Sequence, residues 1–169
     1  RESIRNFSDK EIEIEKISQL LWAAQGKKGY KRTIPSAGAT YPLELYVIFK
    51  KKGIFHYDLE KNVLRMKREG EFNKKLAIAS LDQNFIYEAP LNIIICADFS
   101  RTCNRYGKRG VRYVFIEIGH CAQNIHLEAV ALGLGSVPIG AFYDEMVKNI
   151  IKPPEKIIPF YIIPIGYPK

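Results

Sequence analysis

A run of small residues between Pro35 and Thr40 could organise chemistry. It reads Pro-Ser-Ala-Gly-Ala-Thr and stands directly before an apolar segment typical of a strand. These residues carry little side-chain bulk, and Gly38 frees the local φ angle, so the loop can bring its backbone N–H and C=O groups close to a flat or phosphorylated ligand. The sequence therefore predicts a ligand-binding loop.

Two guanidinium groups and a hydroxyl group stand near the beginning of the chain, on Arg1, Ser3 and Arg5. Arginine is suited to bidentate contact with phosphate, so these residues could bind a phosphate group. A frayed basic terminus is the alternative, and these three residues taken alone favour it.

The residue spacing does not support several other kinds of site. The segment Gly133–Gly140 contains Gly-x-Gly, but it follows a helix and lacks the third glycine of a dinucleotide-binding fingerprint. Ser36 does not stand in the Gly-x-Ser-x-Gly elbow of a hydrolase. His120 and His126 point to different faces of a predicted helix, and the three cysteines lack paired spacing. We therefore expect no metal site and no disulfide.

The composition indicates a folded chain. Hydrophobic residues make up 47% and charged residues 26% of the 169 positions, values close to those of soluble globular proteins. No apolar run approaches the roughly 18 residues of a membrane span, and the first residues are too polar for a signal peptide. We expect one domain over residues 1–169, located in the cytoplasm, with no membrane partner.

The formal net charge of +8 could indicate nucleic-acid binding. The distribution of the charge argues against it, because no predicted helix concentrates lysines on one face among aromatic residues. We expect a solvated basic surface and no nucleic-acid partner. The lysines instead form short groups, mostly at predicted turns or element ends: Lys27–Lys28, Lys50–Lys52 and Lys74–Lys75.

The first half of the chain shows a helical pattern followed by strand patterns. Apolar residues at helical spacing predict a helix from about Asp9 to Ala24, with Ser8 as its cap and Gly26 after its end. A second helix is expected over Glu71–Leu81. Between the helices, β-rich runs separated by turn residues predict an antiparallel meander: Leu45–Lys50, Ile54–Leu59 and Val63–Lys67.

The second half begins with the continuous apolar run LNIIICADF after Pro90, which is typical of a strand buried on both faces. Apolar spacings of four and three predict a long helix from Val111 to Leu132. A short helix is expected around Asp144–Ile150, and the final strand IIPFYIIPIG should lie at a sheet edge because it contains two prolines. Strands and helices mix without regular repetition, which favours an α+β fold.

Six segments taken together resemble one known family. They occur in this order: RESIRNF, LLWAAQG, RTIPSAGATYPLELYV, YEAPLNIIICAD, RYGKRGVRYVFIEIGHCAQNIHLEAVALGLGSVPIGAF and IIPIGYP. They resemble the nitroreductase superfamily of flavin enzymes, in particular its SagB-type branch, which includes azoline dehydrogenases that act on peptide heterocycles. The resemblance covers nearly the whole chain, and the segment PSAGATYPLELY together with E-x-G-H-x-x-Q-N is its most specific part.

The resemblance implies an α+β homodimer with a mostly antiparallel sheet, flanking helices and a long central helix, and FMN bound at the subunit interface. Pro35, Ser36, Ala37, Gly38 and Ala39 would lie against the isoalloxazine ring of the neighbouring subunit's FMN. The remaining residues implied to bind FMN are Arg1, Ser3 and Arg5 at its phosphate, ribityl chain and pyrimidine edge, Gln83 at the pyrimidine, and Pro138, Ile139, Gly140 and Ala141 beside the ring.

The resemblance also suggests the reaction, which is hydride transfer between flavin N5 and a small organic substrate, with NAD(P)H as a candidate reductant. Arg105 and Tyr106 stand where azoline dehydrogenases of the branch carry a Lys-Tyr pair. Arginine stays protonated and cannot act as a general base, although it could hold an anionic substrate. Peptide azoline oxidation is therefore an alternative that this pair disfavours, and a flavin-binding protein without turnover is another.

Overall fold

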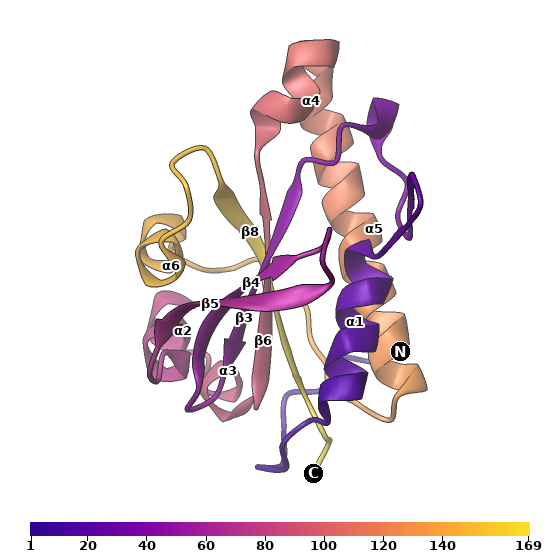
Figure 1. The fold of residues 1–169 in the computed structure, drawn as a ribbon. Coiled ribbons are helices and arrows are strands. Elements are labelled where there is room, and N and C mark those ends of the chain that lie inside the picture. The colour runs from indigo at the N-terminus through magenta and orange to yellow at the C-terminus, as the bar shows by residue number, and fades with distance from the viewer.

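The computed structural model describes residues 1–169, and a six-stranded sheet lies at its centre (Figure 1). The strand order is β5-β4-β3-β6-β8-β7, and every neighbouring pair is antiparallel. This is the predicted α+β architecture. The strands are β3 (Leu43–Phe49), β4 (Gly53–Asp58), β5 (Val63–Glu69), β6 (Leu91–Ala97), β7 (Gly135–Ser136) and β8 (Ile158–Gly166), and a separate hairpin pairs β1 (Lys27–Lys28) with β2 (Lys31–Arg32).

Helices cover both faces of the sheet (Figure 1). On one face α1 (Ile14–Gln25) lies beside the long helix α5 (Arg109–Ala131). On the other face lie α2 (Asn73–Ala79), α3 (Asn84–Glu88) and α6 (Asp144–Ile151). The helix α4 (Phe99–Tyr106) extends beyond the sheet and packs against the start of α5.

Strand β6 forms the middle of the core, as its unbroken apolar sequence predicted. Because successive side chains of a strand point to opposite faces, Ile93 and Ile95 pack toward α1 and α5, whereas Ile94 and Cys96 pack toward α2 and α6. All seven residues of β6 are buried. The strand thus joins the two halves of the core.

The long helix α5 is also present, over 23 residues. Its buried positions recur at helical spacing and include Val114, Ile118 and Ile125. The helix ends at a turn in which Gly133 adopts a φ of +72°, a conformation that glycine adopts without strain. No helix of the chain has both the length and the hydrophobicity that crossing a bilayer requires.

Two predicted helices are shorter than expected. The first begins at Ile14, not Asp9, and Glu13 precedes it where Ser8 was expected as the cap. The segment before it is held against the β3–β4 turn, because Asp9 pairs with Lys50 and Glu11 with Lys52. The second covers only Asn73–Ala79. It stops because Leu81 and Asp82, which follow Ser80 after its end, have positive φ angles that a helix does not allow.

The prediction of an edge position for the last strand is wrong. Strand β8 lies between β6 and the short β7, and an isolated bridge joins Ile139 to Ile162 farther along the same side. Pro164 is tolerated there because a proline still offers its carbonyl group, which accepts a hydrogen bond from the N–H of Val137 at 3.4 Å. The prolines of β8 therefore do not mark it as the edge strand of the sheet.

The helix α4 was missed by the sequence analysis, which assigned Phe99 to the preceding strand. Asp98 caps this helix, because its carboxylate accepts hydrogen bonds from the N–H of Ser100 at 2.9 Å and from its hydroxyl group at 2.6 Å. An aspartate after an apolar run is a typical N-cap signal, so the pattern Asp-Phe-Ser could have predicted the start of α4.

Candidate functional site

The structure brings the predicted site residues together in two groups. The loop group contains Pro35–Ala39 with Arg105 and Tyr106, beside α4. The terminal group contains the N-terminal residues Arg1, Ser3 and Arg5 with Gln83 and Pro138–Ala141, along the outer side of β8. No hydrogen bond or ion pair joins a residue of the loop group to a residue of the terminal group.

The loop group is tightly packed around Gly38, which lies in a short 3-10 turn, η1 (Ala37–Ala39). The carbonyl of Gly38 accepts a hydrogen bond from Nη1 of Arg105 at 3.0 Å. A Cβ atom on Gly38 would lie only 2.5 Å from the hydroxyl oxygen of Tyr106, and the φ of +57° also favours glycine. The positive φ is therefore the main reason for glycine here, and a side chain at this position would also displace the ends of Tyr106 and Arg105.

Hydrogen bonds hold both ends of this loop. The hydroxyl oxygen of Ser36 accepts from the N–H of Tyr41 at 3.0 Å. Thr40 forms a hydrogen bond with Thr102 of α4 at 2.8 Å and donates to the carbonyl of Ala37 at 3.0 Å. The loop is thus fixed to α4 while Pro35, Gly38 and Ala39 remain exposed, so a planar ligand could lie on it.

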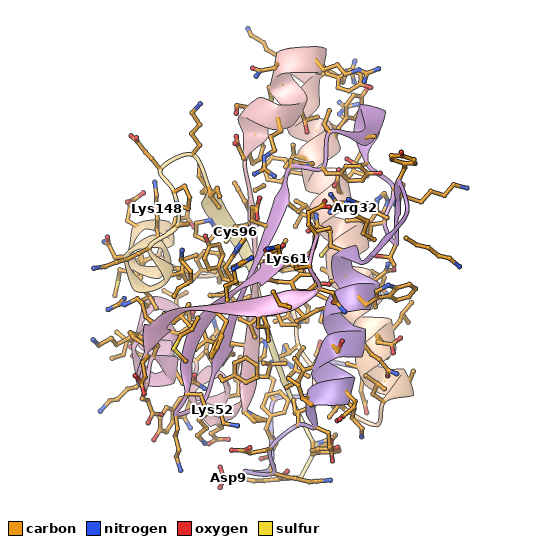
Figure 2. The ribbon with its side chains drawn as sticks, in the orientation of Figure 1. Asp9, Arg32, Lys52, Lys61, Cys96 and Lys148 are labelled. Atoms are coloured by element: carbon orange, nitrogen blue, oxygen red, sulfur yellow. The ribbon has the colours of Figure 1, made fainter.

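A buried carboxylic acid lies behind the loop, and the sequence analysis missed it. Glu117 of α5 is only 2% exposed, and its Oε1 has no hydrogen-bond partner. Burial raises the pKa of Glu117 to about 7, and a hydrogen bond from Ser36 and the charge of Arg32 oppose this rise. Nη1 of Arg32 is itself buried without a partner, and Figure 2 shows Arg32 beside the upper part of α5. The position of Glu117 on the apolar face of the predicted helix could have indicated a buried carboxyl group, because a charged residue is rarely placed there without a reason.

The terminal group begins with a main-chain contact between distant segments. Ser3 pairs with Ser136 in a parallel bridge, and the N–H of Ile4 donates to the carbonyl of Ser136 at 3.1 Å. This contact places the N-terminal residues past the C-terminal end of α5. Arg1 and Arg5 are exposed there and form no ion pair within the chain.

Arg5 forms no ion pair with a neighbouring carboxylate. Asp9 is paired with Lys50 at 3.0 Å. The guanidinium of Arg5 instead lies 5.9 Å from the ring centre of Phe85, within the range of a cation–π contact. Its nitrogen atoms are consequently free to contact an anionic ligand.

Gln83 and the segment 138–141 meet at the other end of the terminal group. Nε2 of Gln83 donates to the carbonyls of Ser80 at 2.8 Å and Ala141 at 3.3 Å. Gly140 and Ala141 are exposed, and neither of their N–H groups takes part in the main-chain hydrogen bonds of the chain. Two unpaired N–H donors in succession fit a ligand that carries hydrogen-bond acceptors.

A buried histidine supports the terminal group. Nδ1 of His126 on α5 lies 2.7 Å from the hydroxyl oxygen of Ser136, while its Nε2 is buried and has no partner. Burial and, to a smaller extent, the charge of Arg1 lower the pKa of His126 to about 4. His126 is therefore neutral at pH 7. His120 is exposed, which confirms that the two histidines point to different faces of α5.

The free groups match FMN, the cofactor implied by the sequence resemblance. Its phosphate requires cationic donors, which the unpaired guanidiniums of Arg1 and Arg5 provide, and its ring requires amide donors and a flat, unobstructed surface. A cavity of about 620 Å³ lies elsewhere, beside Asp9 and Lys50–Lys52, where two of the lysines are already paired with acids. That cavity contains none of the predicted site residues.

Comparison with known proteins gives consistent matches over the whole chain. The model of the nitroreductase family matches residues 1–167. A Methanocaldococcus jannaschii protein named "Putative nitroreductase" is 41% identical over 174 residues, which cover 98% of this chain and 86% of that protein. An Archaeoglobus fulgidus protein named "Putative NADH dehydrogenase/NAD(P)H nitroreductase" is 28% identical, covering 100% and 82%. The crystal structure of a "putative nitroreductase" from Ralstonia eutropha has a TM-score of 0.87 at 26% identity, covering 100% of this chain and 80% of that chain.

Proposed function

Because the chain belongs to the nitroreductase family of FMN-type oxidoreductases, we propose that it binds FMN non-covalently between two identical subunits. We propose further that it transfers hydride between this flavin and a small organic substrate. FMN is favoured over FAD, since the chain lacks the dinucleotide fingerprint that would hold an adenylate.

The separation of the two groups of site residues is the observation that carries this proposal. Gly38 contacts Arg105 and Tyr106, which directly precede α5, whereas Ser3 contacts Ser136, which follows it. The 23 residues of α5 span about 34 Å at ~1.5 Å per residue, and Figure 1 shows η1 and the N-terminus toward opposite ends of this helix. A flavin held by the Gly38 loop at the start of α5 would not reach Arg1 and Ser3 beyond the end of α5 in the same chain. We therefore propose that a complete site combines the loop group of one subunit with the terminal group of its partner.

Bound FMN would supply the ring that accepts and donates hydride. The chain's own residues would bind and orient it. The guanidiniums of Arg1 and Arg5 would neutralise its phosphate or its pyrimidine edge. The free N–H groups of Gly140 and Ala141 would donate to ring acceptors, while Gln83, already turned toward Ala141, would offer its amide group.

The names of relatives support NAD(P)H as the reductant, since one relative is named for NADH and NAD(P)H chemistry. The motifs PSAGATYPLELY and E-x-G-H-x-x-Q-N support membership of the SagB-type branch. Arg105 argues against azoline oxidation, because it stays protonated and already donates to Gly38. The hydroxyl of Tyr106, beside Gly38, is then the one group of the pair able to exchange a proton near the ring.

The test of this function has two steps. Mass analysis of the flavin released by heat should identify FMN, and recovery of FAD, or of no flavin after incubation with excess FMN, would contradict the proposal. The FMN-loaded protein should then oxidise NADH or NADPH in the presence of a quinone or a nitroaromatic acceptor, with the parallel-line kinetics of a ping-pong reaction. Stable flavin binding without any turnover would favour a non-catalytic flavoprotein.

We expect Arg5→Ala to weaken FMN binding at least tenfold. A charge-assisted hydrogen bond would be lost, and a tenfold change corresponds to about 1.4 kcal/mol. Equilibrium dialysis of FMN measures the effect, with Arg65→Ala as the control because Arg65 is an exposed arginine of β5. If Arg5→Ala retains FMN like the unchanged protein, then Arg5 is a solvated surface residue and its assignment is wrong.

We expect Leu127→Asp to convert a homodimer into monomers that lose their flavin. Leu127 belongs to a face of α5 whose apolar residues are at least 41% exposed, a larger apolar surface than a monomer usually presents to solvent. Light scattering at low micromolar concentration measures the mass, and Met66→Asp, on the exposed edge strand β5, is the matched control. A flavin-loaded monomer of the unchanged protein would contradict the proposal. The apolar residues of this face and its flanks are Val111, Phe115, Ile116, Leu127 and Val130.

A further inference from the structure

A concentration of positive charge beside the loop group has no counterpart in the function proposed so far. The 14 residues from Ser100 to Tyr113 include five arginines or lysines and no acidic residue. Arg101 is neutralised by Glu44 at 2.6 Å and Asp98 at 3.7 Å. We call the remaining four residues the basic cluster: Arg105, Lys108, Arg109 and Arg112.

The basic cluster lacks acidic partners within the chain. Lys108, Arg109 and Arg112 are exposed and take part in no side-chain hydrogen bond or ion pair, and Arg105 contacts only the carbonyl of Gly38 and the face of Tyr106. In Figure 2, side-chain nitrogen atoms gather around α4 and the start of α5. Lys50 and Lys52, by contrast, are paired with acids. What distinguishes the cluster is that four unpaired cations lie within one segment of eight residues, from Arg105 to Arg112.

This arrangement is locally unfavourable for the fold. Lys108 precedes the first residue of α5, Arg109 is that first residue, and the first turn has no acidic side chain. Cations at the start of a helix are repelled by its dipole and by one another. Residues that violate a local rule without a structural compensation often serve a function.

The position of the cluster indicates what that function is. Arg105 binds the carbonyl of Gly38, in the loop proposed to lie against the flavin ring, and Tyr106 stacks edge-on against Tyr113 of α5 at 5.1 Å. The tight turn that joins α4 to α5, where a Cβ on Gly110 would lie 2.9 Å from Cys103, fixes the cluster beside the loop. A substrate that approaches the loop past Arg105 would therefore come near the start of α5, where Lys108, Arg109 and Arg112 are exposed.

We infer that the basic cluster binds an anionic group beyond the diphosphate that NADH and NADPH share, namely a further phosphate, a sulfonate or a carboxylate on one substrate, while the reacting part of that substrate reaches the flavin. The inference rests on the proposed function. The anionic group could belong to the reductant, as in the 2′-phosphate that distinguishes NADPH from NADH, or to the electron acceptor. Ping-pong kinetics allow these two sources to be measured separately.

The experiment compares the FMN-loaded protein with Arg109→Gln and Arg112→Gln. Lys156→Gln, an exposed lysine distant from α4 along the chain, is the control. Two pairs of compounds are used: 1,4-naphthoquinone with its 2-sulfonate as acceptors, and NADH with NADPH as reductants. For at least one pair, the ratio of kcat/KM for the anionic member to that for the neutral or less charged member should fall at least fivefold in both arginine variants, and raising the salt concentration should reduce the same ratio.

Binding without turnover gives an independent measurement. Equilibrium dialysis of the sulfonated quinone against the oxidised protein should show at least fivefold weaker binding in the arginine variants if the acceptor carries the anion, and dialysis of NADP⁺ does the same for the reductant. Unchanged ratios and unchanged binding for both pairs would overturn the inference, as would an equal effect of Lys156→Gln. So would a change in subunit dissociation alone, which would show that carboxylates of a second subunit pair with the cluster. Absence of flavin, or of turnover with every compound, would instead contradict the proposed function.

Discussion

Glu117→Gln is expected to stabilise the protein at pH 8 by about 2 kcal/mol and to leave its stability nearly unchanged at pH 4. Burial raises the pKa of Glu117 from 4.5 to about 7. A carboxyl group with a raised pKa binds a proton more tightly in the folded chain, so folding becomes less favourable as the pH rises from 4.5 to about 7. Each pKa unit corresponds to about 1.4 kcal/mol, and partial solvent screening reduces the total.

Glutamine retains the shape of the protonated acid and an oxygen that can accept from Ser36, but it never ionises. The difference in unfolding free energy between the variant and the unchanged protein should therefore grow from pH 4.5 to 7 and stay constant above pH 7. Urea unfolding at a series of pH values measures it. Glu128→Gln, on the same helix but partly exposed, controls for the loss of a carboxylate from α5. A difference independent of pH would show that Glu117 is not buried in an environment that resists its charge.

This cost suggests why a carboxyl group is placed behind the loop group. A hydrogen bond from Ser36 and the charge of Arg32 connect Glu117 on α5 to the beginning of the Pro35–Ala39 loop and to the segment before it. An apolar residue at Glu117 would relieve the burial of charge but could not hold Ser36. Buried ionic groups of this kind contribute more to a specific local geometry than to stability.

The elements that were predicted well are those whose own apolar pattern is enough to show which residues are buried. Strand β6 is apolar at nearly every position, and α5 keeps one period over six turns, so no competing structure fits either segment. The start of α1 depends instead on ion pairs from Asp9 and Glu11 to lysines about forty residues away. Such partners cannot be recognised from a local pattern.

The same distinction applies to the candidate site. A binding role was predicted for Pro35–Ala39 because these small residues form one contiguous run, and for Arg105–Tyr106 because of the family resemblance. Both roles remain predictions, and the structure adds that Gly38 lies against Arg105 and Tyr106. Glu117 and His126 were not identified as support for the site. Their importance depends on which loop packs against α5, and the helical period alone shows only that each lies on a buried face.

His126→Asn should remove much of the protein's sensitivity to acid. Burial, helped by the charge of Arg1, lowers the pKa of His126 from 6.5 to about 4. A histidine with a lowered pKa contributes stability that is complete above pH 6.5 and is lost as the pH falls through about 4, because the unfolded chain binds the proton more tightly. The loss should reach about 2 kcal/mol after allowance for solvent screening.

Asparagine places an amide group near the position of Nδ1, so it can keep the hydrogen bond to Ser136, and it does not titrate. At pH 7 the variant should be less stable than the unchanged protein, because the smaller side chain leaves space in the core. That deficit should shrink by about 2 kcal/mol between pH 7 and pH 4, as measured by urea unfolding. His120→Asn, on an exposed face of α5, shows how much of the change any histidine of this helix produces. A deficit that stays constant over this range would mean that His126 has the same pKa in the folded and the unfolded chain, so that neither its burial nor the charge of Arg1 opposes its protonation.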